Sequence, residues 1–168
     1  MNKKGFTLVE LLIVIGLIGI TVGVTGDIIL TLIRSYSKTQ ATTDVERVAS
    51  FAVGKIEKEF KNATSVTSVS SNSITFETKA FDALPTTVTY AVNNTGCSGT
   101  TCLKRNGVML TDATEVIAAC SGNCFNRIST DPETIKIKIR FTKANTGNSV
   151  FSGEVLVNTT VVAKGTYN

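Results

Sequence analysis

The sequence predicts an α+β fold in which one long N-terminal helix packs on an antiparallel β-sheet body. Apolar residues recur at steps of three and four through residue 63, which is helical spacing. From about residue 65 onward they recur at every second position, which is typical of half-buried strands. No second helical stretch separates the candidate strands, and this favours antiparallel pairing in a body formed by residues 64–168.

Residues 6–26 form an apolar run that contains one ionisable residue, Glu10. At about 1.5 Å per residue, a helix of this length spans the roughly 30 Å hydrocarbon core of a bilayer. Lys3 and Lys4 precede the run, so the positive-inside rule places the N-terminus in the cytoplasm and the body outside it. A secretory signal peptide is the alternative, but the run is too long and no A-x-A-like cleavage site follows it. We expect a single-pass membrane protein.

The helical pattern continues through residues 27–63 with one charged and one apolar face. The polar, β-branched stretch Ser37–Thr43 predicts a bend or fraying in the middle of this segment. We therefore expect one helix from Phe6 to Ala63, transmembrane in its first half and amphipathic in its second. The apolar positions of the second half are Ile29, Ile33, Tyr36, Val45, Val48, Ala52, Ile56, Phe60 and Ala63.

Five segments of the body have the alternation and composition of strands. The last of them is expected to be interrupted. They are Ser73–Lys79, Thr86–Asn93, Cys102–Leu110, Thr134–Thr142 and Val150–Ala163.

The composition argues against an enzyme. The chain contains no histidine, which removes every Ser-His and Cys-His nucleophile pair. It also contains no glycine-rich phosphate-binding loop, and no cofactor is expected. The net charge of +4 is mild, and Lys3 and Lys4 supply half of it, so charge alone does not demand a nucleic-acid partner.

Glu10 is unusual because a carboxylate inside an apolar span costs free energy. It could snorkel to the headgroups and gain from the helix dipole. Alternatively, it could neutralise a positive charge inside the membrane. No Lys or Arg lies between Phe6 and Ile33, so that charge would come from an N-terminal amine or from another subunit.

The stretch KKGFTLVELLIVIGLIGI resembles the processing signal of type IV prepilins and their pseudopilin relatives. The resemblance implies a type IV pilin-like fold and a leader of residues 1–5. A prepilin peptidase would cut between Gly5 and Phe6 and methylate the Phe6 amine, and Glu10 would meet the Phe6 amine of a neighbouring subunit. It also implies an inner-membrane assembly platform, membrane lipid before assembly, and a final place in an extracellular or periplasmic filament.

The order of body segments is similar to that of J-type minor pseudopilins and related minor pilins. The segments are KIEKEFKNA, ITFET, VTYAV, CLKRNGV and a terminal LVNTTVVAKGTYN. This similarity implies a structural subunit of a type IV pilus or of a type II secretion-like filament. Two alternatives remain open: a major pilin, and a binding module at the tip of a competence-type pilus. Major pilins commonly carry a proline near this point of the helix, whereas this chain has Asp27 preceded by Gly26.

The four cysteines, Cys97, Cys102, Cys120 and Cys124, could form a zinc site or two disulfides. Disulfides are favoured because the body is expected outside the cytoplasm, where thiols oxidise. Three pairings are possible, and we favour Cys97–Cys102 with Cys120–Cys124, each bond closing a short loop.

Lys136, Lys138 and Arg140 alternate with apolar residues along one candidate strand. A solvated strand face that deters edge pairing is the simpler interpretation, and a stripe that contacts DNA or another ligand is the alternative. Asp112, Glu115, Asp131 and Glu133 could bind calcium if their loops converged, but they lack EF-hand spacing, so no metal site is predicted.

Overall fold

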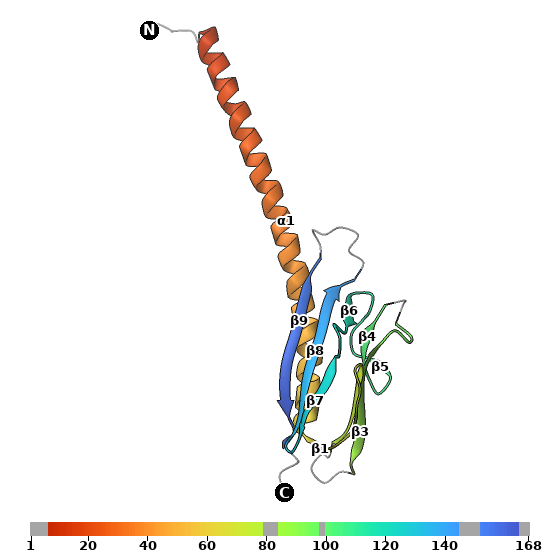
Figure 1. Cartoon of the computed structure of the whole chain (residues 1–168). Helices are drawn as coiled ribbons and strands as arrows, with labels where there is room; N and C mark the ends of the chain where they lie inside the picture. Colours follow the sequence, from red (N-terminus) through yellow and green to blue (C-terminus); the bar gives the residue numbers. More distant parts are fainter. Residues whose placement is uncertain (1–6, 79–83, 98–99, 145–151, 165–168) are drawn as a thin grey trace.

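The computed structural model describes residues 7–78, 84–97, 100–144 and 152–164 and confirms the α+β arrangement. One helix, α1 (Leu8–Lys61), projects far beyond a body of antiparallel sheets (Figure 1). The strands of the body are β1 (Ala63–Val69), β2 (Ser73–Thr78), β3 (Thr86–Asn93), β4 (Cys102–Arg105), β5 (Val108–Met109), β6 (Val116–Ala119), β7 (Phe125–Thr130), β8 (Glu133–Lys143) and β9 (Glu154–Val162).

Helix α1 is continuous, so the expected bend within Ser37–Thr43 is wrong. The hydroxyls of this stretch donate to carbonyl oxygens four residues earlier, as Thr39 does to Ser35 at 2.9 Å and Thr42 does to Lys38 at 3.1 Å. Because these bonds satisfy the side chains within the helix, they do not compete with its backbone. The helix ends at Lys61, close to the expected end at about Ala63, where β1 begins.

The first sheet has the order β1-β2-β3-β4-β5, with antiparallel pairing throughout. The expected single strand Cys102–Leu110 is wrong, because the chain reverses at Asn106 and Gly107. These two residues have φ angles of 49° and 82°, which an Asn-Gly pair adopts readily in a two-residue hairpin turn. The turn therefore divides the segment into β4 and β5.

The second sheet is built around β8. Strand β9 pairs along one edge of β8, from Thr142↔Glu154 to Thr134↔Val162. Strands β6 and β7 share the opposite edge in series, with Ala119 opposite Arg140 and Phe125 opposite Ile137. Strand β9 is uninterrupted, unlike the expected Val150–Ala163, whose first two residues lie outside the described residues.

The core lies where the second half of α1 meets both sheets. From α1 it contains Val45, Ala49, Ala52, Val53, Ile56 and Phe60, and from β8 it contains Ile135, Ile137, Ile139 and Phe141. Phe76 of β2 and Tyr90 of β3 complete it from the other sheet, where Phe60 and Phe76 pack edge to face with ring centroids 5.4 Å apart. All buried residues of α1 lie at Ala41 or later, so the helix splits into a body-forming half and an exposed half.

Polar contacts also fix the body to the second half of α1. Lys143 of β8 pairs with Asp44 at 3.2 Å, and Thr159 of β9 donates a hydrogen bond to Glu57 at 3.1 Å. These contacts span several turns of the helix. The body therefore cannot tilt against α1 without breaking them.

Candidate assembly interface

The first half of α1 presents an exposed apolar surface on all sides. Every residue from Thr7 to Tyr36 is exposed, and large side chains such as Leu8 and Ile20 retain 75% and 67% of their accessible surface. A helix that is apolar all round requires an apolar environment all round. Within the described residues, α1 is the one helix long and apolar enough to cross a membrane, and none of its apolar window is buried in the body.

Glu10 takes part in a capping box with Thr7, the N-cap residue of α1. The Thr7 backbone N–H and hydroxyl both donate to Glu10 Oε2 at 3.0 Å, and the Glu10 N–H donates to Thr7 Oγ1 at 3.2 Å. Within the chain, the carboxylate therefore has a local partner at the start of the helix. Gly5 and Phe6, the expected processing residues, lie outside the described residues.

Thr7 is a site residue that the sequence analysis missed. The signal was present, because Thr-x-x-Glu before an apolar run is the capping-box pattern. A glutamate at this position both carries a charge and caps the helix. Within the chain, the capping box uses Oε2 of the Glu10 carboxylate.

A comparison with known families supports a prepilin origin for this segment. Residues 1–26 match the prokaryotic N-terminal methylation motif. The chain has a type IV prepilin-like N-terminus. The motif is typical of structural subunits that a prepilin peptidase processes and that assemble with other pilins. A search of curated proteins and a search of solved structures each gave no match.

The exposed helix agrees with this prepilin-like assignment. Its apolar half fits a membrane-anchored pilin, and the long helix followed by antiparallel sheets is a type IV pilin-like arrangement. The motif covers residues 1–26, which include the expected leader and the whole apolar run but none of the body.

The cysteines form the two disulfides that were favoured for a body outside the cytoplasm. Cys97 pairs with Cys102 and Cys120 with Cys124, with Cα–Cα distances of 6.0 and 4.9 Å. All four thiols are thereby used. The second bond spans the connection between β6 and β7, and it therefore holds these two strands in line along the edge of β8.

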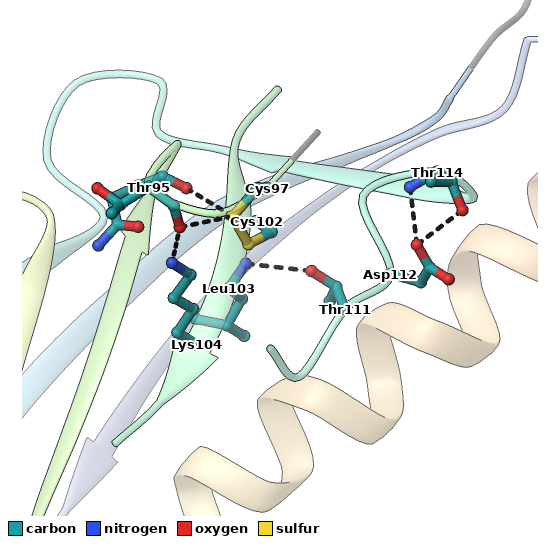
Figure 2. Close-up of a disulfide and its surroundings, with 9 residues drawn as sticks. Thr95, Cys97, Cys102, Leu103, Lys104, Thr111, Asp112 and Thr114 are labelled. Atoms are coloured by element: carbon teal, nitrogen blue, oxygen red, sulfur yellow. Dashed lines mark hydrogen bonds between the residues drawn. A yellow bond between two sulfur atoms is a disulfide. The ribbon is translucent and has the colours of Figure 1, made fainter. Parts of the chain in front are cut away.

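The first disulfide closes the connection between β3 and β4 (Figure 2). Both of its cysteines are buried, and the neighbouring Lys104 is 8% exposed. The Lys104 ammonium donates to the carbonyl oxygen of Thr95, and the Leu103 N–H donates to Thr111 Oγ1 at 3.1 Å. A buried ammonium needs such a partner, so the closed loop keeps a carbonyl in place for Lys104.

The basic residues Lys136, Lys138 and Arg140 lie on the face of β8 that points away from α1. Their neighbours Ile135, Ile137 and Ile139 are fully buried on the opposite face. Arg140 pairs with Glu154 at 3.3 Å, and Lys138 lies opposite Asn158 of β9. The three basic residues therefore lie together on one face of β8, and Arg140 is the one paired with an acidic residue.

The acidic residues considered for calcium do not form a metal cluster in the described part of the chain. Instead, Asp112 accepts hydrogen bonds from the Thr114 hydroxyl at 2.7 Å and from its N–H at 2.9 Å (Figure 2). These bonds lower the pKa of Asp112. Glu133 lies 3.2 Å from Arg127 across a strand pair.

Proposed function

We propose that this prepilin-like chain is a structural subunit, a minor pilin or pseudopilin, of a type IV pilus or type II secretion-like filament. The observation that carries the proposal is the division of α1. Its first half is apolar and exposed, while its second half forms the core of the body without a break between them. Such a helix can anchor one rigid body first in lipid and then in a bundle of like helices.

The free energy of burial supports transfer from lipid to protein rather than exposure to water. Burying one large aliphatic side chain contributes roughly 1.5–3 kcal/mol, and the exposed half carries many of them. A subunit leaving the membrane must therefore exchange lipid for the apolar helices of its neighbours. In this proposal the prepilin peptidase cuts between Gly5 and Phe6, and the inner-membrane assembly platform moves the subunit into the filament.

Glu10 would act at this transfer. In the membrane the capping box gives its carboxylate a partner, and in the filament a neighbour's Phe6 amine would add an opposite charge. A buried carboxylate is costly unless it is paired, so the pairing would favour one axial register between neighbours.

The experiment is mass spectrometry of sheared, purified filaments. We expect the chain to be present at a lower copy number than the most abundant subunit, with an N-methylated Phe6 as its first residue. A chain that still begins with Met1 in these filaments would contradict the processing step. A copy number equal to that of the most abundant subunit would instead identify a major pilin.

A second candidate function is a tip-located module that binds DNA or a surface ligand. The outward stripe of Lys136, Lys138 and Arg140 favours it. A gel-shift titration of the body with double-stranded DNA tests it. Loss of a salt-dependent shift in a variant with all three residues changed to glutamine would support DNA binding, and an absent shift for the wild type would exclude it.

A further inference from the structure

Asp27 is the only charged residue between Leu11 and Ile33. It lies 21 residues beyond Phe6, or about 30 Å along a helix, so in a bilayer its carboxylate reaches the outer interface and stays hydrated. In a lipid-free filament core the same carboxylate would need a cation. On its own helix the nearest cation along the sequence is Arg34, two turns away, and no ion pair joins them in the described structure.

A groove with suitable cations lies on the outer face of α1. It has a volume of about 560 Å³ and is lined by Ser50, Phe51, Gly54, Lys55, Lys58, Glu59, Asn62 and Thr78. Phe51, one of the lining residues, is 63% exposed and so presents an apolar ring to solvent in the groove. A Cβ added at Gly54 would meet nothing within 4 Å, so another helix can approach the α1 backbone closely there.

The available charge in this groove is positive. Glu59 already accepts hydrogen bonds from Arg105 Nε at 2.9 and 3.1 Å and from the Tyr90 hydroxyl at 2.8 Å. Lys55 and Lys58 form no ion pair among the described residues. The groove thus combines an apolar aromatic surface with two ammonium groups that have no acidic partner.

We propose that this groove receives the apolar half of α1 from a second copy, whose Asp27 pairs with Lys55 or Lys58. The proposal rests on the filament function above and requires that two copies of this chain be neighbours within one filament. The apolar half supplies side chains that can cover Phe51, and its Asp27 supplies an acid for the two ammonium groups. The apolar half and its Asp27 therefore complement Phe51 and the two lysines of the groove on another copy of the same chain.

The proposal fixes the relative height of the two copies. Asp27 precedes Lys55 by 28 residues and Lys58 by 31, so parallel helices must be displaced by about 42–47 Å for these groups to meet. Two copies at the same depth in a membrane cannot make this contact. The pair is consequently a marker of the assembled filament and is absent from the membrane pool.

Carbodiimide coupling of full-length protein tests the contact, because this reagent joins a carboxyl to an adjacent amine as an amide. We expect an Asp27–Lys55 or Asp27–Lys58 peptide in purified filaments and none in the membrane fraction. Coupling within one chain is impossible, since the groups are about 42 Å apart along a continuous helix. Coupling of Asp27 to Lys38 instead, or no coupling of Asp27 in filaments, would overturn the proposal.

Charge exchange gives an independent test in cells. Asp27→Lys alone, or Lys55→Asp with Lys58→Asp, should reduce incorporation into filaments about tenfold or more, because each leaves like charges facing one another. All three changes together should restore incorporation to within about threefold of wild type. Rescue of Asp27→Lys by Arg34→Asp would assign the partner to Arg34 and overturn the proposal.

Charge-neutralising variants distinguish loss of the ion pair from loss of folding. Asp27→Asn, and Lys55→Gln with Lys58→Gln, remove charge without reversing it, and membrane levels of every variant are measured by immunoblot. If these variants accumulate and incorporate normally, the pairing is wrong while the filament function stands. If the wild-type chain never enters filaments, the filament function itself fails.

Discussion

Gly153 lies against the backbone of Ala41 at the point where α1 leaves the body. A Cβ at Gly153 would fall 2.6 Å from the Ala41 carbonyl oxygen and 2.8 Å from the Thr42 nitrogen. Only glycine allows the chain leading into β9 to approach the helix this closely. Ala41 is also the first buried residue of α1, so this contact marks the boundary between the exposed half and the half that the body covers.

We predict that Gly153→Ala lowers the free energy of unfolding of the body, residues 33–168, by about 1–3 kcal/mol, since helix backbone cannot yield as a flexible side chain can. This fragment retains every described buried residue. Denaturant unfolding measures the effect. Gly54→Ala is the matched control, because it adds the same methyl in open space and should stabilise the helix by up to about 1 kcal/mol. Equal effects of the two variants would contradict the close contact.

The second prediction concerns alkaline pH. Burial, with a further contribution from Glu59, raises the pKa of Tyr90. Because the folded-state pKa exceeds the unfolded value of about 10, the stabilisation is complete below that pH and is lost as the pH rises toward the folded pKa. The stability difference between wild type and Tyr90→Phe should therefore shrink above about pH 10 in urea titrations.

Tyr36→Phe is the control for this titration, since Tyr36 is 66% exposed on α1. The same measurement on Tyr36→Phe gives the effect of removing a tyrosine hydroxyl outside the core. A constant difference between wild type and Tyr90→Phe up to pH 12 would show that Tyr90 does not couple to folding.

The third prediction concerns the disulfides. The body purified without reductant should contain no free thiol and no zinc. Changing both Cys97 and Cys102 to serine should lower the free energy of unfolding by about 2 kcal/mol, as expected for so short a closed loop. Thiol titration and metal analysis check the first part. One bound zinc per chain would overturn the disulfide assignment.

The fourth prediction separates the two roles of Glu10. Glutamine can still form a capping box, but it removes the charge, whereas leucine removes both. If charge pairing drives assembly, Glu10→Gln and Glu10→Leu should each reduce incorporation about tenfold or more, while membrane insertion remains intact. Normal incorporation of Glu10→Gln with loss for Glu10→Leu would assign the requirement to capping instead.

The sequence predicted the long helix and three strands well because their patterns are strong. The apolar spacing of α1 and the alternation in β2, β3 and β8 each persist over most of the element. Strands β1, β6 and β7 were missed. β1 is largely exposed, and β6 has four residues, so neither shows a convincing alternation. Strand β7 lacks apolar alternation in its sequence, because Arg127 and Ser129 take the less exposed positions while Ile128 is 55% exposed.

The candidate interface was predictable only in part. The processing motif and Glu10 are local patterns and can be recognised from the sequence. The groove at Phe51 could not be predicted, because its existence depends on which side of α1 the body covers. The Asn106–Gly107 pair is a strong hairpin signal in the sequence. The residues on both sides of it are typical of strands, so the segment was predicted as one strand.

Because α1 is one continuous helix, the rotational orientation of the body about the helix axis is fixed relative to the apolar half. In a continuous helix each residue advances the chain by about 1.5 Å and turns it by about 100°. Inserting one residue between Arg34 and Gln40 would therefore turn the whole body by about 100° about the axis of its own anchor. Inserting seven would restore its heading to within about 20° and raise it by about 10 Å. The direction in which each body faces outward is thus set by the number of residues in the helix.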